Sequence, residues 1–187
     1  MESGDDGMDV TPGTSCYDAL LVGRVRSHDW EAAIGIYDTM KERGVSIGPQ
    51  TIQGLVLAHQ QIGGKEAVVS AMEEVLRNDK GAKIRNGVFQ LIAQLLFENM
   101  DLQSFDTFRQ PVRAVGEQDP QLRDSSLRLV RSLRVAEIET DRPSSKHKSE
   151  AEMETIQDKA WIDATKHLLE FFKAIPEDED DNKLSRV

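Results

Sequence analysis

The sequence predicts an all-α fold, a short right-handed α-solenoid of helix-turn-helix repeats with C-terminal capping helices. Apolar residues recur every three or four positions along most of the chain, which is the spacing of one helix face. Aromatic residues make up 5% of the 187 residues and charged residues 30%, which suits a modest helical core better than a β-sandwich. Finally, two consecutive segments share one apolar pattern at an offset of 35 residues.

The first predicted hairpin covers residues 15–48. Ser15 and Asp18 have the spacing of a capping box and open its first helix. Asp29 is a favoured N-cap for the second helix, and Gly44 supplies a left-handed stop after it. The apolar stripes of these two helices are Tyr17, Leu20, Leu21 and Val25, and then Trp30, Ala33, Ile34, Tyr37 and Met40.

The second predicted hairpin covers residues 49–83 and repeats the first. Pro49 suits the first turn of a helix, and Gly63-Gly64 should separate the two helices. The pairs at the 35-residue offset are Tyr17 and Ile52, Leu20 and Leu55, Leu21 and Val56, Tyr37 and Met72, and Glu31-Ala32 and Glu66-Ala67. One such hairpin cannot bury its stripe alone, so the two are expected to stack.

A third, degenerate unit is expected over residues 84–139. Its first helix should follow residue 87, and Asp101 is a candidate cap for a second helix. Pro111 falls inside that second helix and should kink or shorten it. Asp119-Pro120 has the pattern of an N-cap and first helical position for one more helix.

The C-terminal part is predicted as a linker over 140–148 and a long helix over 149–175. Ser149 and Glu152 form its capping box. The helix carries Trp161 and several large apolar side chains, which either cap the solenoid or form a helix-in-groove site for a partner. The acidic segments 1–14 and 176–187 are expected to be disordered.

Three stretches resemble the pentatricopeptide repeat (PPR) family. YDALL at residues 17–21, DWEAA at 29–33 and MKERGV at 40–45 are similar to that family's motifs, at its 35-residue period. The resemblance is good over 14–48 and fair over 49–83. It implies a PPR-like RNA-binding or RNA-processing accessory protein that acts on single-stranded RNA in a mitochondrion or chloroplast, with the cytoplasm as the alternative.

The same resemblance implies which residues contact RNA. The family reads bases with the residue after the Tyr-like position and with the last residue of the repeat, here Asp18 with Gly48 and Gln53 with about Lys83. The chain departs from the family's usual Asn, Ser or Thr at the first position. In a separate Arg-rich stretch, Arg128 and Arg131 are candidate contacts to the phosphate backbone, or else part of a solvated helix face.

Composition limits the other functions. The net charge is −10, but residues 16–175 carry only −3, so unaided electrostatic capture of RNA should be weak. The single cysteine, Cys16, excludes a disulfide framework, and no hydrolase, P-loop or metal motif is visible. We therefore expect no catalysis, no cofactor, no small-molecule substrate and no metal. With no apolar run long enough to span a bilayer and no transit peptide visible, we expect a soluble chain, or a fragment of a longer array. The competing interpretation is a helical-repeat scaffold that binds proteins and not RNA.

Overall fold

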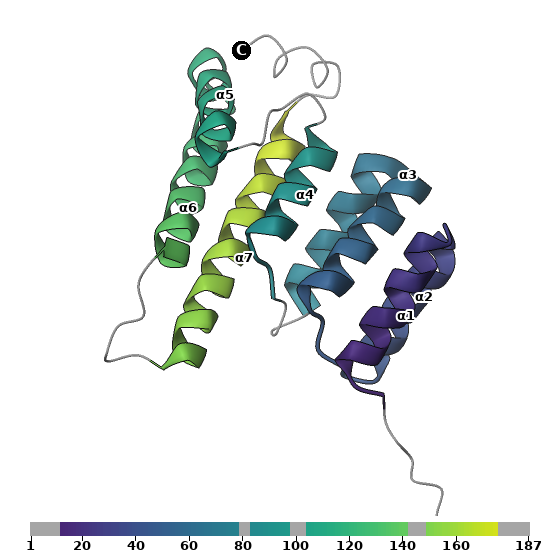
Figure 1. Ribbon diagram of the computed structural model, residues 1–187. Helices are drawn as coiled ribbons and strands as arrows, with labels where there is room; N and C mark the ends of the chain where they lie inside the picture. Colours follow the sequence, from purple (N-terminus) through teal and green to yellow (C-terminus); the bar gives the residue numbers. More distant parts are fainter. Residues whose placement is uncertain (1–11, 79–82, 98–103, 142–148, 176–187) are drawn as a thin grey trace, which may run out of the picture.

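A computed structural model describes residues 12–78, 83–97, 104–141 and 149–175 of the chain (Figure 1). Within these ranges every regular element is an α-helix, so the predicted all-α class is correct. The helices are α1 (Thr14–Arg26), α2 (Trp30–Glu42), α3 (Pro49–Asn78), α4 (Asn86–Leu96), α5 (Phe105–Gln118), α6 (Arg123–Asp141) and α7 (Glu150–Ala174). None of the described helices is both long and apolar enough to cross a bilayer.

Helices α1 and α2 form the first hairpin, with boundaries close to the predicted ones. The predicted capping box does not form, because α1 begins at Thr14 and Ser15 already lies inside the helix. Asp29 does occupy the N-cap position of α2, as predicted, but its carboxylate makes no capping hydrogen bond and accepts one from Arg24 Nη1 at 2.9 Å instead. Gly44 does adopt the predicted left-handed conformation (φ 63°), which lets the Val45 N–H reach the Met40 carbonyl at 2.9 Å.

Helix α3 holds both helices of the second hairpin. Gly63 (φ −141°) and Gly64 (φ 67°, ψ −153°) are non-helical, and they divide α3 into a first part, 49–62, and a second part, 65–78. The break is where the sequence predicts it, and the conformation of Gly64 is one that only glycine adopts without strain.

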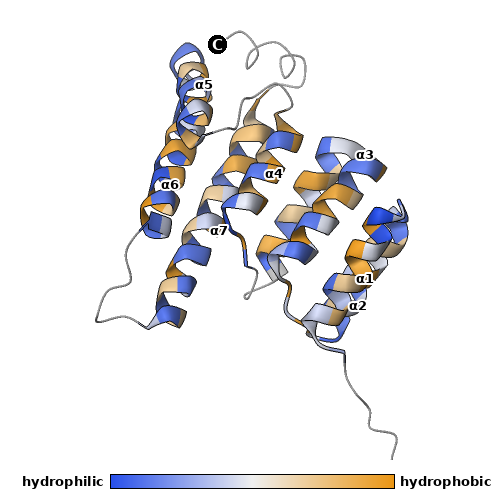
Figure 2. Cartoon of the chain, viewed as in Figure 1, coloured by the Kyte–Doolittle hydropathy of each residue, from blue (hydrophilic) through white to orange (hydrophobic). Residues whose placement is uncertain are grey.

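The helices of the first two hairpins lie side by side (Figure 1), and α1 packs against both α2 and α3. Their apolar faces turn toward neighbouring helices (Figure 2). The closest approach is at Gly54, where a Cβ atom would lie 1.9 Å from Cδ2 of the fully buried Leu21. Glycine at this position therefore allows α1 and the first part of α3 to pack at short range.

The third unit differs from the prediction. The backbone of α4 packs along α3 and α7, whereas the prediction paired α4 with the helix that is now α5. Helices α5 and α6 form a hairpin that packs on α7, which lies between α4 and α6 (Figure 1). The reason is apolar area, because α7 buries Trp161, Leu168, Leu169, Phe171 and Phe172 within the chain.

An aromatic cluster joins α4, α5 and α7. Phe89 on α4 contacts Phe105 and Phe108 of α5 with ring centroids 6.0 Å apart, and Trp161 of α7 at 5.5 Å. Trp161 Nε1 donates a hydrogen bond to Thr140 Oγ1 at 3.0 Å, so the indole leaves no polar atom unpaired in the core. The cluster holds the C-terminal half together around α7.

The remaining boundaries, those of α5 and α6, differ from the predicted ones. Helix α5 is capped by Ser104, whose box partner is Thr107, and the predicted cap Asp101 lies outside the described residues. The helix continues through Pro111 to Gln118, because the buried face on either side of the proline holds it in place. Helix α6 starts at Arg123, and Asp119 forms a turn before it by accepting from the Gln121 N–H at 2.9 Å.

The capping box of α7 forms as predicted, from Ser149 and Glu152. Residues 142–148, which hold most of the predicted linker, and residues 1–11 and 176–187 of the acidic ends lie outside the described part of the chain.

Candidate functional site

A groove of about 710 Å³ runs between α1 and the first part of α3. We call it the N-terminal groove. Its polar lining is Ser15, Asp18, Arg26, Gln50 and Gln53, and its aliphatic lining includes Val22, Val25 and Leu57. Two of the predicted site residues, Asp18 and Gln53, thus lie in one groove.

Their positions on two neighbouring helices explain why these two residues meet. Tyr17 and Ile52 are both buried in the core, and each is followed directly by its lining residue. Successive helical residues are about 100° apart around the axis, so the residue after a core position lies at the edge of the buried face. Equivalent positions on two neighbouring helices therefore present Asp18 and Gln53 to the same opening.

The carboxylate of Asp18 is held in place by a buried neighbour. The hydroxyl of Thr51, which is fully buried, donates a hydrogen bond to Oδ1 of Asp18. A Cβ atom at Gly48 would lie 3.9 Å from the other oxygen, Oδ2, so residue 48 adjoins Asp18 without covering it. Arg26 is the only other charged side chain of the lining, so the groove is close to neutral.

The amide of Gln53 is half-buried and adjoins the start of α4. A Cβ atom at Gly87 would lie 3.9 Å from Gln53 Nε2, so this end of the groove is also left open by a glycine. The groove thus offers a carboxylate acceptor at one position and an amide, both donor and acceptor, at the other. Such a lining can recognise polar edges of a planar ligand, with Val22 and Leu57 against its faces.

Lys83 does not line the N-terminal groove. Its Nζ lies 3.0 Å from Oε1 of Glu154 on α7, and Arg85 pairs with the same carboxylate. The hydrogen bond with Lys83 is the main reason that the pKa of Glu154 lies below its usual value. Asp158, one turn further along α7, lies 3.8 Å from Arg85 Nε, and burial raises the pKa of its carboxyl. Lys83 and Arg85 therefore tie the segment before α4 to α7.

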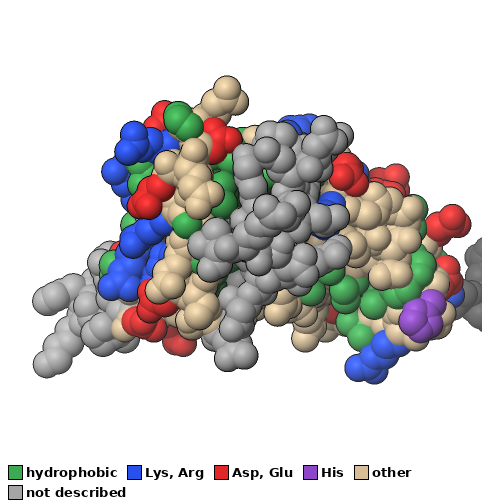
Figure 3. All heavy atoms as spheres, turned by 90° about the horizontal axis from the view of Figure 1, so that it is seen from above, with side chains coloured by type: hydrophobic (Ala, Val, Ile, Leu, Met, Phe, Trp, Pro, Cys, Tyr) green, Lys and Arg blue, Asp and Glu red, His purple; other side chains and the backbone are tan. Residues whose placement is uncertain are grey.

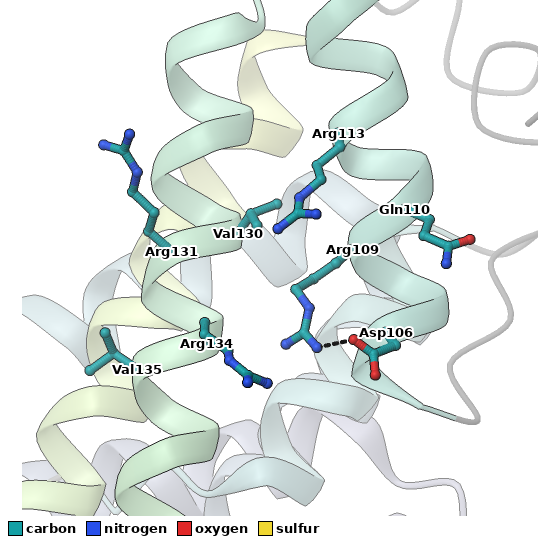
Figure 4. A pocket seen from close by; sticks show the side chains of 8 residues that line it. All are labelled: Asp106, Arg109, Gln110, Arg113, Val130, Arg131, Arg134 and Val135. Carbon is teal, nitrogen blue, oxygen red and sulfur yellow. Dashed lines mark hydrogen bonds and ion pairs between the residues drawn. The ribbon is translucent and has the colours of Figure 1, made fainter.

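Arg128 and Arg131 are both exposed on α6, at the far end of the molecule from α1 (Figure 1). Arg131 lines a second groove, between α5 and α6, together with Arg109, Arg113 and Arg134 (Figure 4). Arg128 is not part of its lining. The predicted residues thus fall in three separate places, and only Asp18 and Gln53 are brought together.

Sequence reasoning missed several lining residues, although a signal was present. In the N-terminal groove, residues 15, 18, 22 and 26, and then 50, 53 and 57, are spaced by three and four, which puts each set on one helix face. Arg109 and Arg113 were not missed, because they belong to the Arg-rich stretch that the sequence shows, and they have the same spacing in α5. The repeat offset aligned the helices but did not show which face was open.

Other reactive groups are isolated within the described residues. The described residues contain no group of three or more His, Cys, Asp and Glu side chains that could hold a metal ion. Cys16 is exposed. The pKa of His59 is lowered by burial, which outweighs the opposing charges of Glu74 and Asp38.

No match to this chain was found among family models, curated proteins or solved structures.

Proposed function

We propose that the chain is a non-catalytic, PPR-like helical-repeat protein that binds single-stranded RNA through the N-terminal groove. The observation that carries the proposal is that Asp18 and Gln53, 35 residues apart, line one groove on adjacent helices. In this proposal α1–α2 and the two parts of α3 are two repeats of a short right-handed solenoid, and α4 and α7 continue the stack. The role is organelle RNA processing as part of a complex or a longer array.

Each lining residue has a defined role in the proposal. The Asp18 carboxylate only accepts hydrogen bonds, so it favours a base with donors on its Watson–Crick edge, such as guanine with its N1–H and N2–H groups. The Gln53 amide both donates and accepts and can pair with several bases. The aliphatic side chains of Val22 and Leu57 supply apolar surface beside the bases.

Affinity is expected to be low. No aromatic side chain among the described residues lines the groove, so contacts to two bases contribute about 1–3 kcal/mol if each adds one net hydrogen bond of about 0.5–1.5 kcal/mol. Association costs an estimated 4–15 kcal/mol. The groove is also nearly neutral, so electrostatic attraction adds little. Tight binding therefore requires further repeats or a partner, and this chain alone should bind no more tightly than the millimolar range at low salt.

The test is a fluorescence anisotropy titration with a labelled mixed-sequence single-stranded RNA at low salt. Gln53→Ala should weaken binding about two- to tenfold, the effect of losing one hydrogen bond. The control is Gln61→Ala, because Gln61 is exposed on the same part of α3 but does not line the groove. No saturable binding up to millimolar protein, or an equal loss in both variants, contradicts the proposal.

Asp18→Asn provides a second test in the same assay. The amide keeps an oxygen for the Thr51 hydroxyl, adds a donor and removes a negative charge from the groove. RNA affinity should rise and the preference for guanine should fall.

The second candidate is a protein-interaction scaffold without RNA binding. Two contacts favour it. Asp18 already accepts a hydrogen bond from Thr51, and Lys83 already forms an ion pair with Glu154. In this case the titration shows no saturable RNA binding by the wild type, and Asp18→Asn changes nothing.

A further inference from the structure

The groove between α5 and α6 has a composition unlike the rest of the surface. It has a volume of about 680 Å³, and α5 contributes Asp106, Arg109, Gln110 and Arg113 to its lining. The facing helix, α6, contributes Val130, Arg131, Arg134 and Val135. We call it the arginine groove. Figure 4 shows Arg109, Arg113 and Arg134 pointing into the space between the helices, with Arg131 on the outer side of α6.

The arginine groove carries more positive than negative charge. Arg109 is only 6% exposed and is held by Asp106 and by Glu137, so its charge is compensated inside the protein. Arg134 lies 3.9 Å from Glu137, a carboxylate that Arg109 already uses. The described residues provide no ion-pair partner for Arg113 or Arg131.

The carboxylate of Asp106 shows how closely these groups are placed. Its pKa is lowered chiefly by the hydrogen bond with Arg109, and additionally by the charges of Arg134 and Arg113. The groove thus brings four guanidinium groups together, while the two nearby carboxylates, Asp106 and Glu137, pair among the described residues only with Arg109 and Arg134, in a chain whose net charge is −10. Lys and Arg side chains gather at this end of the molecule (Figure 3). An anionic ligand would relieve the mutual repulsion of the arginines.

Apolar side chains lie beside the arginines. Leu127, Arg131, Val135 and Ile138 are spaced by four, four and three residues, so they form one face of α6, which we call the α6 stripe. Leu127 is 39% exposed, Val135 52% and Ile138 48%. Among the described residues only Leu20 and Ile62 are other large apolar side chains with comparable exposure. The surface therefore combines cations with unburied aliphatic area.

This combination distinguishes between two anionic ligands. A nucleic acid would offer phosphates to the arginines, but phosphates would leave the exposed aliphatic side chains of Leu127, Val135 and Ile138 uncovered. An acidic amphipathic helix offers carboxylates to the arginines and aliphatic side chains to the α6 stripe. From Leu127 to Ile138 the stripe spans about 16 Å, three turns of helix.

We propose that the arginine groove and the α6 stripe form a docking site for an acidic amphipathic helix of a partner protein, about three turns long. Its carboxylates pair with Arg113, Arg131 and Arg134, and its apolar side chains cover Val135 and Ile138. The site is at the other end of the stack from the N-terminal groove (Figure 1) and does not depend on RNA binding.

The test uses the full chain and a designed probe. The probe is a labelled helical peptide of about 15 residues with leucines spaced by three and four and glutamates beside them, and a second peptide has glutamine in place of glutamate. The wild type should bind the glutamate peptide at least about tenfold more tightly, and the difference should shrink with added salt.

The variant pair Arg113→Gln with Arg131→Gln should weaken glutamate-peptide binding about tenfold. Arg128→Gln is the matched control, since Arg128 is an exposed arginine on α6 outside the groove, and it should change binding less than twofold. Val135→Ser should weaken binding of both peptides several-fold. Circular dichroism must show the same helix content in every variant.

Three outcomes overturn the proposal. The first is no binding of the glutamate peptide, or an equal loss with Arg128→Gln. The second is a labelled single-stranded RNA whose binding is lost in the Arg113/Arg131 variant while peptide binding is kept, which assigns the groove to nucleic acid. The third is a dimer in sedimentation that Arg131→Gln dissociates, which assigns it to a second copy. Because RNA binding is tested separately by Gln53→Ala, failure of either proposal leaves the other standing.

Discussion

Replacing Gly54 with alanine tests the close packing of α1 on α3. The new Cβ atom would lie 1.9 Å from Leu21 Cδ2 and 3.5 Å from Val25 Cγ2. Leu21 is fully buried, so any shift of its side chain disturbs the packing of its neighbours. Overpacking of this kind costs about 1–3 kcal/mol, while alanine in place of a helical glycine contributes about 0.5–1 kcal/mol. The clash is the larger effect, and we expect a net loss of about 1 kcal/mol.

A matched control separates the two contributions. Gly23 is an exposed glycine in α1 with no atom within 4 Å of an added Cβ. Gly23→Ala should therefore raise the free energy of unfolding by about 0.5–1 kcal/mol. The assay is urea unfolding followed by circular dichroism, and in thermal unfolding each kcal/mol corresponds to about 2–4 °C in a chain of this size.

The double variant makes the test specific to the contact. Leu21→Ala alone should cost about 2–5 kcal/mol because it leaves a cavity, and the methyl group that Gly54→Ala introduces would partly fill that space. The combined variant should be less destabilised than the sum by about 1 kcal/mol or more. If Gly54→Ala stabilises the chain as Gly23→Ala does, or if the two changes simply add, the close packing of α1 on α3 is refuted.

Further predictions concern the α5–α6 crossing, a histidine and an ion pair. Gly116→Ala should destabilise by about 1–3 kcal/mol in urea unfolding, because the added Cβ would lie 2.5 Å from Ser126 Oγ; a neutral result would contradict the crossing. Burial lowers the pKa of His59, so the unfolded chain binds a proton first and stability should fall as pH drops below about 6.5; His59→Gln should flatten that slope, and an unchanged slope would show that His59 is not its source. Glu154→Gln should release Lys83 and steepen the salt dependence of RNA binding in anisotropy, whereas an unchanged slope would show that the released Lys83 does not contact the RNA.

Helices with strong local signals could be predicted from the sequence. Gly44 and Gly63-Gly64 mark the ends of helices because their backbone conformations are unfavourable for other residues. The offset of 35 residues also predicted that Asp18 and Gln53 occupy equivalent positions, and both line the N-terminal groove. The glycine signals depend on near neighbours in the chain, and the offset required only that two similar helices lie side by side.

The partner of α4 could not be predicted in this way. Spacing along the chain favoured α5, but α7 offers more apolar area and packs against α4 and α3 from about 60 residues further on. The ion pair of Lys83 depends on the same contact. Glu154 reaches Lys83 and Arg85, and Asp158 reaches Arg85, only when α7 lies there. The arginine groove likewise requires the α5–α6 crossing, which no local pattern specifies.

Photo-cross-linking tests the central claim, that the first two repeats share one RNA-binding groove, most directly. A single-stranded RNA containing 4-thiouridine is bound to the full chain, irradiated, and the attached peptides are identified by mass spectrometry. We predict cross-links on both sides of the N-terminal groove, within 15–26 of α1 and 50–57 of α3. Cross-links confined to α5 and α6, or spread evenly over the exposed surface, would contradict the claim.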